Sequence, residues 1–220
     1  TSLLQAEAPD AVSMITHYSK LAFHQDLSAA SGKQVLDLLD DYISGNAGDY
    51  FLAVEGAIPL GMPEACIIGH KPIADYLIDA AKTMSGAIAI GTCSAYGGIP
   101  AAEGNPTGAV SLNGFYKTIN KNPLLISIPG CPVHPDWVWK TIIHLVKLGL
   151  PKLKDNRPAA FFSRRVHELC PRYHDFQQEI FAEKLGEKGC LFKLGCLGPE
   201  TFSDCPTRWW NSGQTWCVDA

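Results

Sequence analysis

Short apolar segments that lead into glycine alternate with amphipathic segments over the first two thirds of the chain. Residues 50–54, 86–90 and 124–128 are three nearly continuous apolar runs, and each is followed within two residues by glycine. Runs of this kind are typical of strands that are buried on both faces of a sheet. Residues 19–23 are expected to add a further strand to the same sheet.

Amphipathic helical patterns surround these runs. Apolar side chains recur three and four positions apart over residues 33–44, 72–84 and 135–148, and Pro135 stands where a helix tolerates proline, in its first turn. Alternation of buried strands with such helices predicts an α/β fold with a doubly wound, parallel sheet.

The pattern changes after Pro151. Residues 151–220 are rich in glycine and proline, contain five of the eight cysteines, and predict one helix, over 175–185. An irregular stretch of this length is either disordered or organised by something other than an apolar core, and its aromatic and cysteine content argues against disorder. We therefore expect two domains, 1–155 and 156–220, with the boundary inside 150–158.

Composition narrows the class of protein. The net charge of −4 argues against a nucleic-acid partner, and no run of 18 apolar residues is present to span a membrane. Only 18% of the residues are charged, which predicts a large protein–protein interface. Eight cysteines in 220 residues are too few for a disulfide-built scaffold. Cys66, inside an apolar stretch, is expected to be an ordinary strand or core residue.

Two of the other cysteines follow predicted strands. Cys93 comes three residues after one apolar run and Cys131 three residues after the next, while Glu55 follows the first run directly. The carboxyl ends of parallel strands share one edge of a sheet, where ligands bind. Two thiolates there could bind a metal or a cluster or form a disulfide, but a metal site usually needs four ligands. On these two cysteines alone, two unrelated loop residues are therefore the favoured interpretation.

The tail offers a complete set of four donors: His167, Cys170, Cys190 and Cys196. Three sulfurs and one nitrogen suit a structural zinc site and equally a 4Fe–4S cluster with one histidine ligand, so their spacing leaves both open. Cys205 precedes proline, and tryptophans separate it from Cys217, which fits a dry environment around a cluster. His134, close to Cys131, either tunes such a site or caps the following helix.

Several long motifs resemble one protein family. They lie at residues 54–59, 91–102, 105–108, 128–137, 167–170 and 189–199. In this order, and over essentially the whole chain, they are similar to the small subunit of nickel–iron hydrogenases.

The resemblance implies a flavodoxin-like amino-terminal domain followed by a loop-rich, cluster-binding carboxy-terminal domain. It implies an electron-transfer subunit of a heterodimer, in which iron–sulfur clusters connect a nickel–iron centre on a separate large subunit, the place of H2 oxidation or H+ reduction, with an external carrier such as a cytochrome. It also implies the periplasm or a periplasm-facing membrane complex, with membrane association only through other subunits or through segments outside this sequence.

The same resemblance assigns ligands to three clusters and no catalytic residue to this chain. Cys93 and Cys131 match two ligands of a proximal 4Fe–4S cluster, His167, Cys170, Cys190 and Cys196 match the four ligands of a distal 4Fe–4S cluster, and Cys205 and Cys217 match the medial cluster. Many relatives have proline where Cys217 stands and hold a 3Fe–4S medial cluster, whereas cysteine resembles members with 4Fe–4S, including nickel–iron–selenium enzymes. We thus expect a medial 4Fe–4S cluster, with 3Fe–4S as the alternative.

Two further positions carry expectations from the family. Gly98 stands where oxygen-tolerant relatives have an additional cysteine, so a standard proximal cluster is expected. Glu55 is either part of a proton path near the subunit interface or a cap of the Gly56 loop. The C-x-x-C loop of the proximal site and the last medial ligands are expected outside residues 1–220, which resemble an internal fragment of the subunit.

Two other functions compete with this one. A zinc-stabilised α/β binding module would account for the tail donors, but not for the cysteines at the sheet edge. The cluster subunit of a related quinone oxidoreductase would account for the proximal half, but it lacks the long tail.

Overall fold

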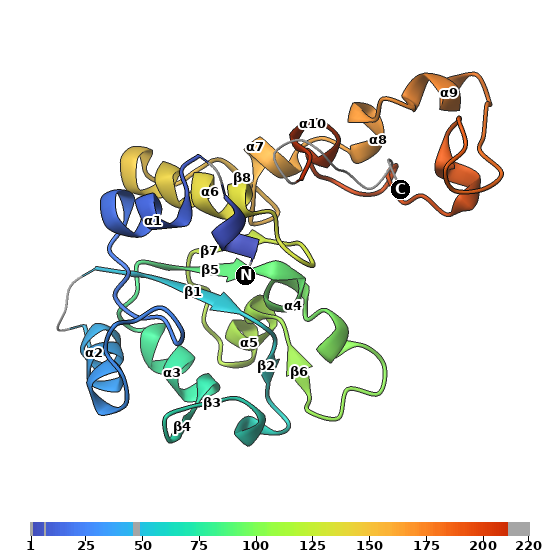
Figure 1. Ribbon diagram of the computed structural model, residues 1–220. Helices are drawn as coiled ribbons and strands as arrows, with labels where there is room; N and C mark the ends of the chain where they lie inside the picture. Colours follow the sequence, from blue (N-terminus) through green and yellow to red (C-terminus); the bar gives the residue numbers. More distant parts are fainter. Residues whose placement is uncertain (1, 7, 46–48, 211–220) are drawn as a thin grey trace. The chain divides into compact units, whose positions relative to one another are not determined.

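The computed structural model describes residues 2–6, 8–45 and 49–210, and the chain divides into two compact units, Thr1–Gly149 and Leu150–Ala220. The first unit is an α/β domain built on a parallel sheet, which confirms the predicted fold class (Figure 1). The second unit consists of short helices joined by loops.

The central sheet has the order β1-β5-β7, with β1 (Phe51–Glu55), β5 (Gly86–Ile90) and β7 (Leu125–Ile128) all parallel. These are the three apolar runs of the sequence. Ile90 pairs in register with Glu55 on one side and Ile128 on the other, so the strands end together at one edge. Every residue of β7 and nearly every residue of β5 is buried, as expected for strands covered on both faces.

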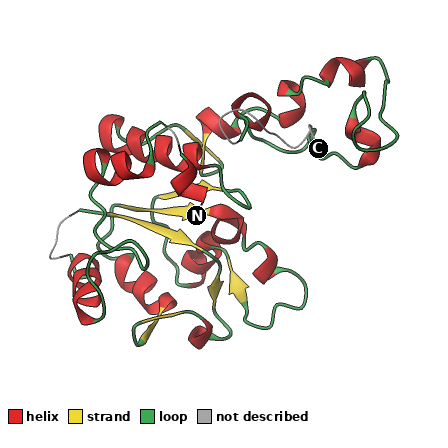
Figure 2. Cartoon of the chain, in the orientation of Figure 1, coloured by secondary structure: helices red, strands yellow, loops and turns green. Residues whose placement is uncertain are grey.

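The three predicted helices are present: α2 (Lys33–Ile43), α3 (Ile73–Ala80) and α6 (Pro135–Leu148). Helices lie on both sides of the sheet, with α6 on one side and α3 on the other (Figure 2). His134 is the N-cap of α6, because its Nδ1 accepts a hydrogen bond from the Asp136 main-chain N–H (3.2 Å). Capping is therefore the interpretation of His134 that the structure supports.

Shorter elements complete the first unit. The helical ones are η1 (Ser2–Gln5), α1 (Ala11–Ser13), η2 (Met14–Tyr18), η3 (Pro63–Ala65), α4 (Gly91–Tyr96), η4 (Ile99–Ala101) and α5 (Leu112–Thr118). Two antiparallel strand pairs join β2 (Ile58–Pro59) to β6 (Ala109–Val110) and β3 (Ile67–Ile68) to β4 (Lys71–Pro72). The sequence patterns did not predict these pairs, because two residues are too few to form a period.

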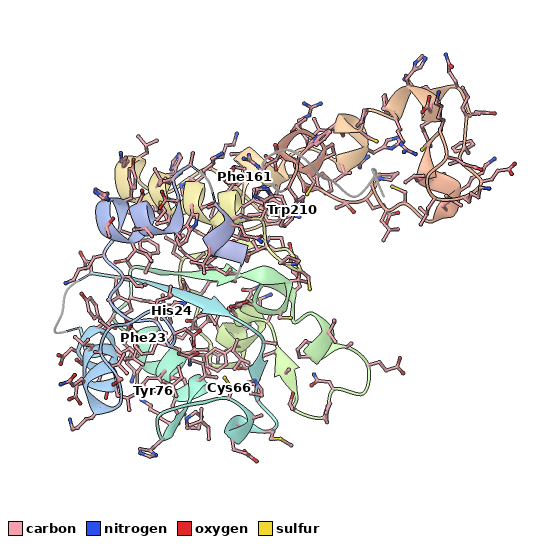
Figure 3. All side chains as sticks on the ribbon, viewed as in Figure 1. Phe23, His24, Cys66, Tyr76, Phe161 and Trp210 are labelled. Carbon is pink, nitrogen blue, oxygen red and sulfur yellow. The ribbon has the colours of Figure 1, made fainter. Side chains whose placement is uncertain are left out.

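The core of this unit lies between the sheet and α3 and α5, where Leu77, Leu112 and Phe115 are buried with the strand residues. A second cluster joins α2 to α3 around Tyr76, and Phe23 packs against it (Figure 3). The strand predicted over 19–23 is wrong: these residues pair with no strand, and Phe23 is half-buried through packing alone. Cys66 is half-buried between η3 and β3 and belongs to neither the central sheet nor the core.

The second unit begins with a hairpin in the segment expected to hold the domain boundary. Its elements are β8 (Leu153–Lys154), β9 (Arg157–Pro158), α7 (Ala159–Phe162), α8 (Val166–Leu169), α9 (Tyr173–Gln177), η5 (Leu191–Leu194) and α10 (Cys205–Arg208). Apart from prolines, only Phe162, Ala182 and Cys190 are buried apolar residues among its described residues.

The helix predicted over 175–185 is also wrong beyond its first turn, because α9 ends at Gln177. Glu179 has φ +58°, which an α-helix does not accommodate, and the carbonyl of Ile180 accepts a hydrogen bond from the Cys190 main-chain N–H (2.9 Å). The chain leaves the helix here to close a loop with Cys190. Across the described residues, none of the helices combines the length and apolar character that crossing a bilayer requires.

Candidate metal centres

The first candidate centre is the edge where the three parallel strands end. Cys93 lies in α4 directly after β5, and Cys131 follows the end of β7. The main-chain N–H of Thr92 donates to the Gly130 carbonyl (2.9 Å), and the Gly130 N–H donates to Thr92 Oγ1 (3.1 Å). These two hydrogen bonds hold the cysteine-bearing loops together at the same edge, as the sequence predicted. Both thiols are free, and that of Cys131 is exposed.

Glycine at position 98 leaves space beside Cys93 at this edge. Gly98 has φ +57° and ψ −151°, and a Cβ added to it would lie 2.7 Å from Cys93 Sγ and 3.0 Å from Cys93 Cα. A side chain at position 98 would therefore displace the thiol. Glu55, at the end of β1, is exposed beside these loops, and its carboxylate makes no hydrogen bond or ion pair within the described residues, so the structure gives no support to a cap of Gly56.

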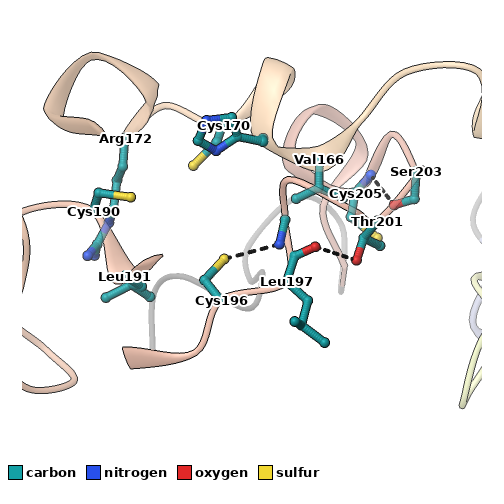
Figure 4. A pocket seen from close by; sticks show the side chains of 12 residues that line it. Val166, Cys170, Arg172, Cys190, Leu191, Cys196, Leu197, Thr201, Ser203 and Cys205 are labelled. Carbon is teal, nitrogen blue, oxygen red and sulfur yellow. Dashed lines mark hydrogen bonds between the residues drawn. The ribbon is translucent and has the colours of Figure 1, made fainter. Parts of the chain in front are cut away.

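The second candidate centre is a pocket of about 280 Å³ in the second unit. Five predicted ligands line it: His167, Cys170, Cys190, Cys196 and Cys205. Figure 4 places Cys170, Cys190 and Cys196 around one part of the hollow, with Cys205 at the opposite end from Cys190. The cysteines are all free, so no disulfide ties the sulfurs to one another.

Main-chain hydrogen bonds bring the segments of this pocket together. The carbonyl of Gly198 accepts from the His167 N–H (3.0 Å), while the Gly198 N–H points to Cys196 Sγ (3.4 Å; Figure 4). The Cys196 N–H in turn donates to the Leu191 carbonyl (3.3 Å), which follows Cys190. Three of the predicted donors are thus connected through the turns that carry them.

Aromatic rings form the wall behind His167. The imidazole meets Phe176 and Tyr173 edge to face, with ring centroids 4.5 and 5.0 Å away. Phe176 also contacts Phe181 and Phe192. Such contacts fix the plane of the imidazole and keep water from that side of the pocket.

Two thiols in the pocket, those of Cys170 and Cys205, are partly desolvated, whereas Cys196 is exposed. Burial raises the pKa of Cys170, and the neighbouring thiols of Cys190 and Cys196 raise it further. Burial also raises the pKa of Cys205, whose main-chain N–H donates to Ser203 Oγ (3.1 Å). Cys190 itself is buried. An apolar hollow lined by thiols is the environment in which a sulfur-ligated centre is held away from water.

The arrangement of the donors favours a cluster over a single ion. Zinc holds its sulfur and nitrogen ligands at about 2.0–2.3 Å, so the four donor atoms of a zinc site lie close together around the ion. Among the described residues, no three histidine, cysteine or acidic side chains are grouped closely enough to hold one metal ion. The donors line a hollow instead, which fits a body larger than an ion and disfavours the zinc alternative.

One contributor to the pocket escaped the sequence analysis. Arg172 lines it, and its Nη1 donates to the carbonyls of Glu187 (3.1 Å) and Gly189 (2.8 Å). This guanidinium anchors the loop that leads into Cys190. Its position two residues after Cys170 was the only available signal. Cys217, predicted as a medial ligand, lies outside the described residues.

Comparison with known proteins gives a consistent picture. A family model described as the C-terminal part of the NiFe/NiFeSe hydrogenase small subunit matches residues 162–220, and one described as the 20 kDa subunit of NADH ubiquinone oxidoreductase matches residues 1–145. The chain is 38% identical over 237 residues to the periplasmic [NiFeSe] hydrogenase small subunit of Desulfomicrobium baculatum, covering 99% of this chain and 75% of that protein. It is 39% identical over 226 residues to the hydrogenase-2 small chain of Escherichia coli K12, covering 99% and 60%.

Solved structures agree with these matches. The reduced, active form of the Ni-Fe-Se hydrogenase from Desulfomicrobium baculatum superposes with a TM-score of 0.91 at 38% identity, over 100% of this chain and 86% of that chain. The recombinant [NiFeSe] hydrogenase from Desulfovibrio vulgaris Hildenborough gives a TM-score of 0.90 at 33% identity, over 99% of this chain and 84% of that chain.

Proposed function

This chain belongs to the hydrogenase small-subunit family, and we propose that it relays electrons through iron–sulfur clusters between a nickel–iron site on a large subunit and an external redox carrier. The observation that carries the proposal is the apolar pocket into which five thiol and imidazole donors project. A bound iron–sulfur cluster supplies reversible one-electron transfer at a potential set by its surroundings. The protein's own residues hold, orient and shield it.

The distal cluster would be held by His167, Cys170, Cys190 and Cys196. The phenyl ring of Phe176 keeps the imidazole of His167 in one plane, and the Gly198 N–H is directed at Cys196 Sγ, where it stabilises negative charge on the sulfur. The apolar lining of the pocket and the burial of Cys190 help to keep water away from the ligands. These contacts act on the ligands and so tune the site.

The proximal cluster would take Cys93 and Cys131 as two of its ligands. The hydrogen bonds between Thr92 and Gly130 hold the two cysteine-bearing loops together, and Gly98 leaves the space next to Cys93 Sγ open. Glu55 at the same edge is available for a proton path near the subunit interface.

The medial cluster would take Cys205 and Cys217, and we propose 4Fe–4S for it. Cys205 lies at the far end of the pocket from Cys190 (Figure 4), which supports its assignment to a centre other than the distal one. A fourth thiolate at Cys217 would add negative charge and lower the potential relative to a 3Fe–4S centre.

The competing function, a cluster subunit of a quinone oxidoreductase, has support from the family model that matches residues 1–145. The tail favours the hydrogenase function, because residues 162–220 match the hydrogenase model and carry the proposed distal donors. We further propose a periplasmic or periplasm-facing location, from the relative named as periplasmic.

The test uses the chain assembled with its large subunit. We expect brown protein with iron and acid-labile sulfide in equal amounts, no stoichiometric zinc, and EPR signals from reduced 4Fe–4S clusters that appear under hydrogen. A colourless complex with zinc, or clusters that hydrogen does not reduce, would contradict the proposal. Cys190→Ser should remove the distal signal, whereas Cys66→Ser, at a cysteine assigned to neither centre, should leave all signals in place.

A further inference from the structure

Three cations surround one aromatic ring in the second unit. The Lys154 ammonium lies 4.9 Å from the centroid of Phe202, the Arg165 guanidinium 5.6 Å and the Arg157 guanidinium 5.8 Å. Main-chain pairing enforces this grouping: Lys154 and Arg157 are directly opposite each other in the β8–β9 hairpin, and Arg165 forms a β-bridge with Phe202. The pairing of the main chain therefore keeps the three charged residues close together.

The hairpin that carries two of these charges is tight. Asp155 and Asn156 form its turn and have φ +52° and +62°, the positive values that two-residue hairpin turns require. Like charges directly opposite each other across a strand pair repel. The hairpin places Lys154 and Arg157 in that relation in spite of the repulsion.

Few ion pairs neutralise these three cations. Within the described part of the chain, the one ion pair made by these three cations joins Arg157 Nη2 to Asp155 (3.3 Å), and the Asp155 side chain is 74% exposed. Because this ion pair is exposed to water, it offsets little of the repulsion among the three cations.

Arg157 is the least satisfied of the three cations. Its side chain is 17% exposed, and its Nε is buried without a hydrogen-bond partner among the described residues. A guanidinium taken out of water needs acceptors for its donors. Lys154 and Arg165 are exposed next to it, so a ligand can reach these cations from solvent.

We propose that Lys154, Arg157 and Arg165 form a binding site for an oxyanion, with the ring of Phe202 as its floor. The ligand is a carboxylate or a phosphate, because the planar guanidinium of the exposed Arg165 presents paired donors that match two oxygens of such a group, and Lys154 adds a further positive charge. Its source is either a free anion or an acidic side chain of a partner subunit, and the same three cations would recognise both. None of the three cations is a proposed cluster ligand, so the test of this site does not depend on the proposed electron transfer.

The experiment uses the assembled hydrogenase and inorganic phosphate as the probe. The thermal midpoint is measured in phosphate and in chloride at equal ionic strength, and the affinity between the subunits is measured alongside. Lys154→Gln and Arg165→Gln are the test variants, since both side chains are exposed and should fold normally. Lys152→Gln, another exposed lysine two residues before Lys154, is the matched control.

If the ligand is a free anion, phosphate should raise the thermal midpoint of the wild type and of the control. Each test variant should then bind phosphate at least about tenfold more weakly, because it has lost one charged hydrogen bond. A partner carboxylate as the source predicts no phosphate effect, but subunit affinity at least about tenfold weaker in the test variants than in the control. If both test variants match the control in both measurements, the site does not exist.

Discussion

Gly98 allows a sharp test of the proximal site, because one added methyl group would meet a proposed ligand. The perturbation is Gly98→Ala. The new Cβ would lie 2.7 Å from Cys93 Sγ and 3.2 Å from the Cys93 main-chain nitrogen. Because the second of these atoms belongs to the backbone of α4, the thiol cannot relieve the contact simply by turning.

Two costs add at this position. The φ of +57° and ψ of −151° lie at the border of a region that only glycine occupies readily, and a side chain there costs about 1–3 kcal/mol. Forcing a methyl group into an occupied space costs about another 1–3 kcal/mol. Gly104→Ala separates the two, because Gly104 also has a positive φ (+84°) but open space where its Cβ would stand. The difference between the variants therefore reports the contact with Cys93.

The assay compares both variants in the assembled complex, by thermal midpoint and by EPR of the reduced proximal cluster. Gly98→Ala should lower the midpoint further than Gly104→Ala and should lose or alter the proximal signal, while the distal signal persists. Gly104→Ala should keep both signals. A Gly98→Ala complex with an unchanged proximal signal and the same midpoint as Gly104→Ala would refute the assignment of Cys93.

Three further predictions concern the clusters and the core. If Cys217 is a fourth medial ligand, EPR of the oxidised complex should lack a strong 3Fe–4S signal, and such a signal from intact protein would exclude a medial 4Fe–4S cluster. Stripping iron with a chelator should make residues 150–220 sensitive to protease before residues 1–149, and simultaneous cleavage of both units would contradict a cluster-dependent tail. Leu77→Ala, in the core of the first unit, should cost about 2–5 kcal/mol of stability and lower the thermal midpoint with all EPR signals retained; loss of a cluster signal would show that core and site are coupled.

The sequence was most informative where one physical signal dominated. The apolar run 86–90 is β5 with the same bounds, because a strand buried on both faces needs apolar residues throughout. The helix over 135–148 is α6 with the same bounds, since Pro135 suits its first turn and Gly149, with φ +82°, ends it.

The sequence was least informative where apolar residues pack together outside helices and strands. Phe176, Ile180 and Phe181 have spacings that suit one face of a helix, and they lie in the segment 175–185 that was expected to be helical. In the structure Phe176 and Phe181 belong instead to the aromatic wall behind His167, and the helix stops at Gln177. Periodicity cannot tell a helix face from a loop that places the same rings around a site.

The candidate donors could be selected from the sequence, whereas the residues that support them could not. Cysteine and histidine are chemically distinctive, so His167 and Cys190 could be selected by type and spacing. Arg172 supports the loop to Cys190 by donating to carbonyls fifteen and seventeen residues further along the chain. A contact with a main-chain carbonyl leaves no mark on the identity of the accepting residue, so no sequence pattern could reveal it.

The two candidate centres differ in what holds their ligands in place. At the sheet edge, Cys93 and Cys131 follow buried strands, and hydrogen bonds between Thr92 and Gly130 join their loops without using the cysteine side chains. In the tail, the ligand-bearing segments are joined by a few main-chain hydrogen bonds around a hollow, with hardly any buried apolar side chains beneath them. Ordering so many residues needs a compensating interaction, and ligation of a cluster that binds the folded but not the unfolded chain is the one this donor set can provide. Cluster insertion and folding should accordingly be a single event in the second unit and two separable events in the first.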